Sequence, residues 1–306
     1  MIIRERGSWL SMLFIWRGSV LKKILPQLLI ITGFACLVLF VKGNIYDYKV
    51  KLNPAVFTLI GLALAIFMGF CNSASYDRFW EGRKLWGLLV IETRSLTRQI
   101  TSLIPKADKE KQQQFVKMIA AFSWALNYQL RKKSNTETLE RLLQKEDFER
   151  IKNKRFKPIA ILDLMSERVY EQYQKGNIDS IILAQMDQQM NQFSHIVGAC
   201  ERIDNTPLPF AYKLLMHRTV YLYCFWLPFG LIDIVGLMMP VIVLLISYTF
   251  IALDAIIEEI GDPFGEEEND LALDTICKNI EFSIFEQVKI HQPPFPERNK
   301  NEIFFK

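Results

Sequence analysis

The uncharged stretch from Leu52 to Tyr76 constrains this chain most strongly, because it is long enough to cross a lipid bilayer. A helix needs about 20 apolar residues, each adding about 1.5 Å, to span the hydrocarbon core. The stretch is therefore predicted to be a membrane-spanning helix. It continues directly into the charged residues Asp77 and Arg78.

Two faces of this predicted helix stand out, each repeating at every fourth residue. One face carries small side chains, which allow another helix to approach closely. The other carries bulky apolar side chains that form a stripe along the helix. The small residues are Gly61, Ala65 and Gly69, and the bulky residues are Leu62, Ile66 and Phe70. The stripe either packs inside a helix bundle or lines a hydrophobic pore.

Composition agrees with a membrane protein. The chain has 306 residues, half of them hydrophobic, and a formal charge of +4. Its mean hydropathy of +0.12 is high for a soluble protein. The basic excess is too small to indicate nucleic acid as a partner. The five cysteines form no CxxC pair and no metal spacing with the histidines, so they are expected to be inert packing residues.

Four apolar runs are candidates for membrane spans. They are Ile24–Val41, Leu52–Tyr76, Thr219–Ile232 and Ile234–Leu253. The first run follows a basic N-terminal arm and has no cleavage site for a signal peptidase, so it is expected to remain in the protein. The third run is short for a span and is expected to cross as the partner of the fourth.

The distribution of Lys and Arg predicts the orientation of these spans. Basic residues are concentrated in the N-terminal arm, after the second run and before the third, whereas the turn between the third and fourth has none. Both termini and residues 77–205 are therefore expected in the cytoplasm.

The region between the second and third spans is expected to be a cytoplasmic helical bundle. Met118–Leu130 suits a core helix, and Thr136–Lys154 has the pattern of an amphipathic surface helix. No segment of this region alternates as a strand does. The predicted fold is therefore all-α, in four parts. These are 1–76 (the arm and spans one and two, with a pore helix at 52–76), 77–212 (the cytoplasmic helices), 213–254 (spans three and four) and 255–306 (an acidic segment and tail).

Three blocks, in order along the chain, resemble the bestrophin family of ion channels and its bacterial members. The first is Trp16–Val20, before span one. The second is span two followed by Tyr76–Trp80, which is similar to a pore helix with an Arg-aromatic-Trp corner. The third is Gly261–Asp270, an acidic segment after span four. The stretch Cys200–Tyr212 is also similar to the approach to span three in bacterial members.

This resemblance implies a homopentamer in the bacterial inner membrane, with one central pore lined by span two of each subunit. The partners are then other copies of the chain, membrane lipids and permeant monovalent ions. The family's hydrophobic neck falls on Leu62, Ile66 and Phe70. A second constriction, at the cytoplasmic exit, falls on Ile181 beside Asp179.

The candidate pore residues give a cation preference from the sequence. Phe70 can turn the positive edge of its ring toward an anion, whereas Ile66 departs from the aromatic residue usual at the middle position of animal members. Five copies of Asp179 would form an acidic ring, which favours cations. Asp179 also suits the N-cap position of a helix that begins at Ser180, and it could serve both roles.

The resemblance also nominates a calcium clasp, for which Glu259, Asp262, Glu267 and Asp270 would supply carboxylate oxygens. Asp262 and Glu259 depart from the amides of the animal clasp. The alternative is a solvated acidic segment that pairs with the basic N-terminal arm. No cofactor is expected to be required.

No nucleophile motif, phosphate loop or HExxH motif is present, so an enzyme is not expected. Two alternatives to a channel stay open. A secondary transporter would normally show internal repeats and polar residues at the midplane of broken spans. A membrane-anchored scaffold would use its cytoplasmic bundle to bind a partner.

Overall fold

The computed structural model describes residues 10, 15–16, 18–45, 48–49, 52–104 and 109–291. These residues are helical except for connecting turns and a two-stranded antiparallel hairpin, which pairs β1 (Asn44–Ile45) with β2 (Tyr48–Lys49). The longer helices are α2 (Leu21–Phe40), α3 (Pro54–Leu103), α4 (Lys109–Leu130), α7 (Lys157–Gln174), α8 (Ser180–Asn205), α9 (Phe210–Val235), α10 (Met239–Ile260) and α11 (Leu273–Gln287). The short ones are α5 (Glu137–Leu142), α6 (Lys145–Ile151) and the 3-10 turn η1 (Gly236–Met238). The all-helical expectation is confirmed at this level.

The chain divides into two compact units. Of the described residues, those within 10–79 and 207–262 form the span unit, and those within 80–206 and 263–291 form the bundle unit. The helix α3 contributes its first part to the span unit and its second part to the bundle unit. The division of the sequence into four parts stays a prediction.

Within the part of the chain that the structure describes, three helical runs are long and apolar enough to cross a membrane by length and composition. They are Leu21–Phe40, Pro54–Leu103 and Phe210–Ile260. The third run contains α9, η1 and α10, and so covers the third and fourth predicted spans. The turn lies at 236–238, inside the predicted fourth span, because Gly236 has a positive φ of 51° and Pro240 lies in the first turn of the next helix.

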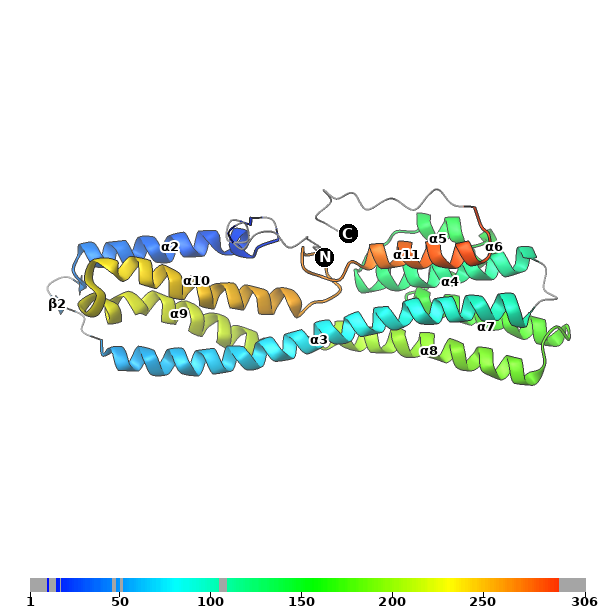
Figure 1. Cartoon of the computed structure of the whole chain (residues 1–306), viewed down its shortest axis with the longest axis horizontal. Helices are drawn as coiled ribbons and strands as arrows, with labels where there is room; N and C mark the ends of the chain where they lie inside the picture. Colours follow the sequence, from blue (N-terminus) through cyan, green and yellow to red (C-terminus); the bar gives the residue numbers. More distant parts are fainter. Residues whose placement is uncertain are drawn as a thin grey trace. The chain divides into compact units, whose positions relative to one another are not determined.

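In the span unit α2, α9 and α10 lie side by side (Figure 1). The buried residues of α2 recur at helical spacing and end at Val38, so one stripe of this helix faces the core. The core is apolar throughout, and its members from α9 and α10 include Cys224, Leu227, Val243 and Ile251.

Two glycines set how closely α3 and α9 approach in this unit. A Cβ on Gly230 would lie 2.5 Å from the ring of Phe57, and a Cβ on Gly61 would lie 2.8 Å from the hydroxyl of Tyr223. The aromatic rings of one helix therefore occupy the space that a side chain on the other would need. Gly61 serves the close approach predicted for the small-residue face, whereas Gly69 has no neighbour within 4 Å of its Cβ position among the described residues.

In the bundle unit α4 lies at the centre. Most of its side chains from Phe115 to Leu130 are buried, and it packs against α7, α8 and α11. The prediction of a core helix over Met118–Leu130 is confirmed. Trp86 and Phe122 are fully buried, whereas Trp80 is 41% exposed and lies under the guanidinium of Arg83 at 5.1 Å.

Two expectations about helix bounds were wrong. The segment Thr136–Lys154 forms two short helices, α5 and α6, because Leu143 is extended between them, with φ −99° and ψ 155°. The helix α3 also shows no corner at Arg78. It runs unbroken from Pro54 to Leu103, since no proline interrupts it. Of the N-terminal block Trp16–Val20, Arg17 lies outside the described residues, as does the tail after His291.

Candidate ion pathway

The three predicted neck residues all lie exposed on the first part of α3. Their exposed fractions are 59% for Leu62, 54% for Ile66 and 71% for Phe70. A step of four residues advances about 6 Å along a helix, so the stripe extends about 12 Å. Each of these bulky apolar side chains keeps more than half of its surface exposed within the single chain. They are available to face lipid, another copy of the chain, or a pore.

The opposite side of the same helix segment is buried. Leu64 and Met68 have 4% and 0% of their surface exposed, and Phe57 and Cys71 are also in the core of the span unit. The intrachain contacts of α3 therefore use one side of the helix and leave the neck side open. Geometry within one chain thus excludes the reading in which the stripe packs inside this chain's own bundle.

The predicted exit residues lie at the start of α8 in the bundle unit. Asp179 is the N-cap of this helix, and its carboxylate accepts a hydrogen bond of 2.8 Å from the backbone N–H of Ile182. The predicted capping role is therefore confirmed. Ile181, which follows in the first turn, has 69% of its surface exposed. The helix-capping carboxylate of Asp179 and the exposed apolar side chain of Ile181 thus lie two residues apart at the start of α8.

A cavity of about 550 Å³ borders Phe70 in the span unit. At its polar side the ring of His217 lies 3.0 Å from the carboxylate of Asp254, and Lys213 lies 3.9 Å from Glu258. The remaining lining is mainly apolar. Phe70 therefore belongs to the exposed stripe and also lines a cavity that carries ionisable groups.

The acidic segment after α10 is organised by an arginine. The side chain of Arg131 on α4 is only 4% exposed, and it lies 2.9 Å from the carboxylate of Asp274. Its guanidinium also donates to the backbone carbonyl oxygens of Phe264, at 3.4 Å, and Leu271, at 3.2 Å. Asn127 donates to Asp274 as well, at 2.5 Å. A buried cation belonging to the protein thus holds both ends of the loop from 264 to 274.

The predicted clasp residues fall in different surroundings. Asp270 is buried and accepts a 2.7 Å hydrogen bond from the backbone N–H of Glu267. Glu259 is buried and Asp262 is exposed, and both belong to the span unit. Among the described residues, no three of His, Cys, Asp and Glu form a group that could hold a metal ion. Calcium binding at these residues stays a prediction.

Sequence reasoning missed two of these features. The contact between His217 and Asp254 joins α9 to α10, and its signal is a polar residue at the matching end of two consecutive apolar helices. The signal for Arg131 is weaker, because a lone arginine at a helix end more often points to solvent. Only the fold reveals that it faces the acidic segment.

The buried cysteines of the bundle unit are poor nucleophiles. Burial raises the pKa of the Cys200 thiol to about 12, and burial also raises the pKa of Cys277. A thiol must lose its proton to react, so both groups are inert near neutral pH. All cysteines of the described chain are free thiols.

Comparison with known proteins identifies relatives along nearly the whole chain. A family model described as Bacterial/Fungal Bestrophin protein matches residues 1–286. The voltage-dependent anion channel-forming protein YneE of Escherichia coli K12 is 40% identical over 302 residues, which cover 98% of this chain and 99% of the relative. The voltage-dependent anion channel-forming protein RSc3414 of Ralstonia nicotianae is 40% identical over 288 residues, which cover 93% of each chain.

Solved structures agree with these sequence matches. The crystal structure of a bacterial bestrophin homologue from Klebsiella pneumoniae matches with a TM-score of 0.85 and 38% identity. The match covers 88% of this chain and 100% of that chain. Sequence and fold therefore point to the same group of proteins.

Proposed function

This chain belongs to the bacterial and fungal bestrophin family, and from that premise we propose that it forms an ion channel whose pore is lined by α3. Its family and its long apolar helices make it an integral membrane protein. The observation that carries the proposal is the stripe of Leu62, Ile66 and Phe70, which is exposed along α3 and uncovered within the chain. An apolar stripe of this kind is what a hydrophobic neck needs.

We propose that five copies assemble around one central pore, with both termini on the cytoplasmic side of the bacterial inner membrane. In this arrangement α2, the first part of α3, α9 and α10 each cross the bilayer. Exposed apolar residues on several faces of the span unit support contacts with lipid and with other copies. The small side chains at Ala65 and Gly69, which are exposed in one chain, would allow a neighbouring subunit to approach.

The neck would act as a hydrophobic constriction. Five copies of each stripe residue would form three stacked apolar rings over about 12 Å. Such constrictions gate by dewetting, because water leaves a narrow apolar pore and ions cannot cross without it. Small changes in the width of the rings would then open or close the path.

The sign of the permeant ion has two candidates. The names of the curated relatives, which are anion channel-forming proteins, support monovalent anions such as chloride. The exposed carboxylate of Asp179 beside Ile181 supports monovalent cations, because an acidic ring at the exit would concentrate them.

The test is recording from purified protein in planar bilayers under a potassium chloride gradient. Discrete current steps would exclude both a scaffold and a transporter, and the sign of the reversal potential identifies the permeant ion. Asp179→Asn is the matched variant, since asparagine caps a helix about as well as aspartate but carries no charge. For a cation pore the variant should move the reversal potential toward zero. For an anion pore it should leave the sign unchanged or increase the selectivity.

We propose that conduction requires no bound calcium, since the guanidinium of Arg131 already supplies a cation to the acidic segment. Currents recorded in a calcium chelator should equal those recorded with added calcium. A large loss of current in the chelator would instead support the clasp at Glu259, Asp262, Glu267 and Asp270.

A further inference from the structure

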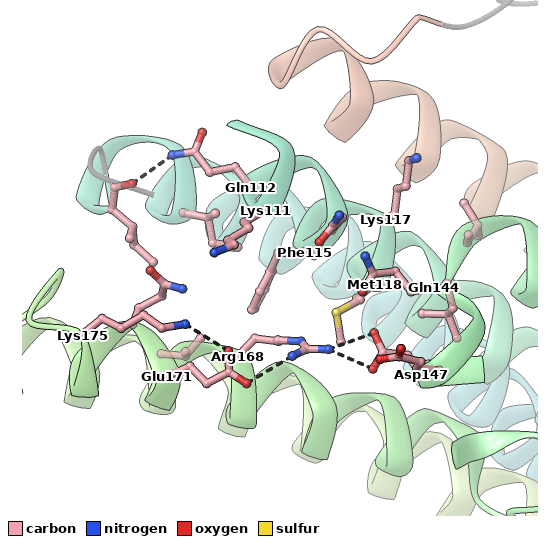
Figure 2. A pocket seen from close by; sticks show the side chains of 18 of the residues that line it. Lys111, Gln112, Phe115, Lys117, Met118, Gln144, Asp147, Arg168, Glu171 and Lys175 are labelled. Atoms are coloured by element: carbon pink, nitrogen blue, oxygen red, sulfur yellow. Dashed lines mark hydrogen bonds and ion pairs between the residues drawn. The ribbon is translucent and has the colours of Figure 1, made fainter. Parts of the chain in front are cut away.

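We propose that the bundle unit contains a binding site for a small organic anion that carries an apolar ring. The site is a cavity of about 420 Å³ between α4, the α5–α6 segment and α7 (Figure 2). Its volume lies within the range of about 300–1,000 Å³ that is usual for small-molecule sites. The residues that line it include none of the proposed neck or exit residues.

The inner wall of this cavity is apolar. Phe115 and Met118 on α4 are 8% and 3% exposed, and Leu142 and Val169 are similarly buried. Figure 2 shows the ring of Phe115 pointing from α4 toward α7. A planar ring of a ligand could therefore pack against an aromatic surface that is already held in place.

Two of the three acidic side chains that line the cavity, Asp147 and Glu171, are already paired with basic side chains. The guanidinium of Arg168 lies 3.1 and 3.4 Å from the two carboxylate oxygens of Asp147 and 3.1 Å from Glu171. Lys175 also faces Glu171, at 3.6 Å. A carboxylate that is paired and, for Asp147, only 4% exposed has little capacity to bind a cationic ligand.

More basic than acidic side chains line the cavity. Lys111 and Lys117 also line the cavity, and neither has an ion-pair partner among the residues that the structure describes. One acidic lining residue, Glu146, is likewise outside the Arg168 network. Figure 2 shows the ammonium groups of Lys111 and Lys175 on the same side of the Phe115 ring. A phosphate or carboxylate beside a ring would meet these two cations while the ring contacts Phe115.

The position of the site suggests what binding does. Lys175 is the C-cap of α7, and Gln172, which also lines the cavity, accepts a 2.8 Å hydrogen bond from Asn177 in the next turn. That turn leads directly to Asp179 and to the exit constriction. A ligand that restrains it would change the current through the channel. This regulatory step rests on the proposed function, whereas the binding site does not.

Binding can be measured without any current. Isothermal titration calorimetry of the full-length protein in detergent should show saturable binding of naphthyl phosphate, with at least tenfold weaker binding of inorganic phosphate. The double variant K111Q/K175Q should lose about tenfold in affinity, since each exposed lysine contributes up to about 1 kcal/mol. K145Q, on α6 but outside the cavity lining, should bind as the parent does.

Three results would overturn the binding site. These are no saturable heat with naphthyl phosphate, equal affinity for inorganic phosphate, or an unchanged affinity in K111Q/K175Q. If the double variant fails to fold, as judged by its elution on gel filtration, F115L provides the second test. It keeps the lysines and should lose affinity for naphthyl phosphate while leaving that for inorganic phosphate unchanged.

The regulatory step is tested by adding naphthyl phosphate to the cytoplasmic side during bilayer recording. The open probability should change in the parent and in K145Q, but not in K111Q/K175Q at the same concentration. Binding without any effect on current would overturn the regulatory step alone. Absence of all current from the parent, with binding intact, would overturn the proposed function and leave the site in place.

Discussion

The two parts of α3 belong to one unbroken helix but meet opposite surroundings. Before Trp80 the helix exposes large apolar side chains on most of its circumference, including Val56, Leu59 and the three neck residues. After Trp80 most of its large apolar side chains are buried, among them Trp86, Leu89 and Leu96, whereas Ile91 is 59% exposed. The bundle unit thus covers its own helix, whereas the span unit leaves the same helix open.

This difference shows which apolar surface is buried within one chain and which must be covered by lipid or by another copy of the chain. An exposed apolar surface of this size costs free energy in water at about 25 cal/mol per Å². A soluble unit avoids that cost by packing, as the second part of α3 does. The first part must be covered by lipid or by other copies of the chain. The exposed side of the first part of α3 is therefore expected to be a contact surface in the membrane-embedded protein.

The largest effect is expected at Arg131, which holds the acidic segment in the bundle unit. Arg131→Met should lower the free energy of unfolding by about 3 kcal/mol, because it leaves Asp274 and two backbone carbonyl oxygens without their buried donor. Thermal unfolding followed by circular dichroism would measure the loss. Arg150→Met is the matched control, since its pair with Glu167 is exposed, and its effect should stay below about 0.5 kcal/mol.

A melting temperature for Arg131→Met equal to that of the Arg150→Met control would contradict this account. The acidic segment would then be held by something other than the guanidinium. The contrast between a self-sufficient bundle unit and an open span unit would lose its main support.

A smaller effect is expected within the small-residue face of α3. Gly61→Ala should destabilise the protein by about 1–2 kcal/mol, because the new Cβ would meet the hydroxyl of Tyr223 at 2.8 Å. Gly69→Ala, on the same face, has no neighbour within 4 Å of its Cβ position among the described residues, so it should not destabilise a single chain. Thermal unfolding in detergent compares the two.

The Gly69→Ala variant also tests whether the open side of α3 is a contact between copies of the chain. If Gly69→Ala disperses the oligomer on gel filtration while Gly61→Ala does not, the open side of α3 is a contact between copies. If both variants only lower the melting temperature equally, the contrast between the packed and open sides of α3 is wrong.

Sequence could predict the periodic parts of this fold and missed those that depend on contacts across it. The stripe of Leu62, Ile66 and Phe70 was visible because helical spacing places its members on one face. The cap at Asp179 was also predictable, because the signal is local. The clasp residues were placed by resemblance, and their sequence spacing gave no sign that Arg131 lies among the neighbouring carbonyl oxygens. The turn near Gly236 was misplaced, since apolar residues continue through it on both sides.

The smallest effect is expected from an exposed ion pair of the bundle unit. Arg150 donates hydrogen bonds to Glu167 and thereby lowers the pKa of that carboxyl. A lowered pKa contributes stability above the usual carboxyl pKa of about 4.3, and the contribution disappears as the pH falls through the lowered value. Because both side chains are about half exposed, the contribution should be only about 0.3 kcal/mol.

Thermal unfolding between pH 7 and pH 3 would measure this contribution as a difference between the parent and Glu167→Gln. The two should differ slightly at pH 7 and converge at the acidic end. Glu140→Gln, which removes an exposed carboxyl outside that pair, should give a smaller difference at pH 7. A gap that widens as the pH falls would show that the sign is wrong.

The central claim is that the open stripe of α3 lines the pore, and single-channel conductance tests it most directly. Ile66→Ala combined with Phe70→Ala should change the unitary conductance several-fold, because the apolar rings become wider. Ile60→Ala is the control. Ile60 is also exposed but lies about 120° from Ile66 around the helix. The unitary conductance of the Ile60→Ala variant should therefore equal that of the parent. Equal conductance in all three proteins, or an effect of Ile60→Ala alone, would contradict the account.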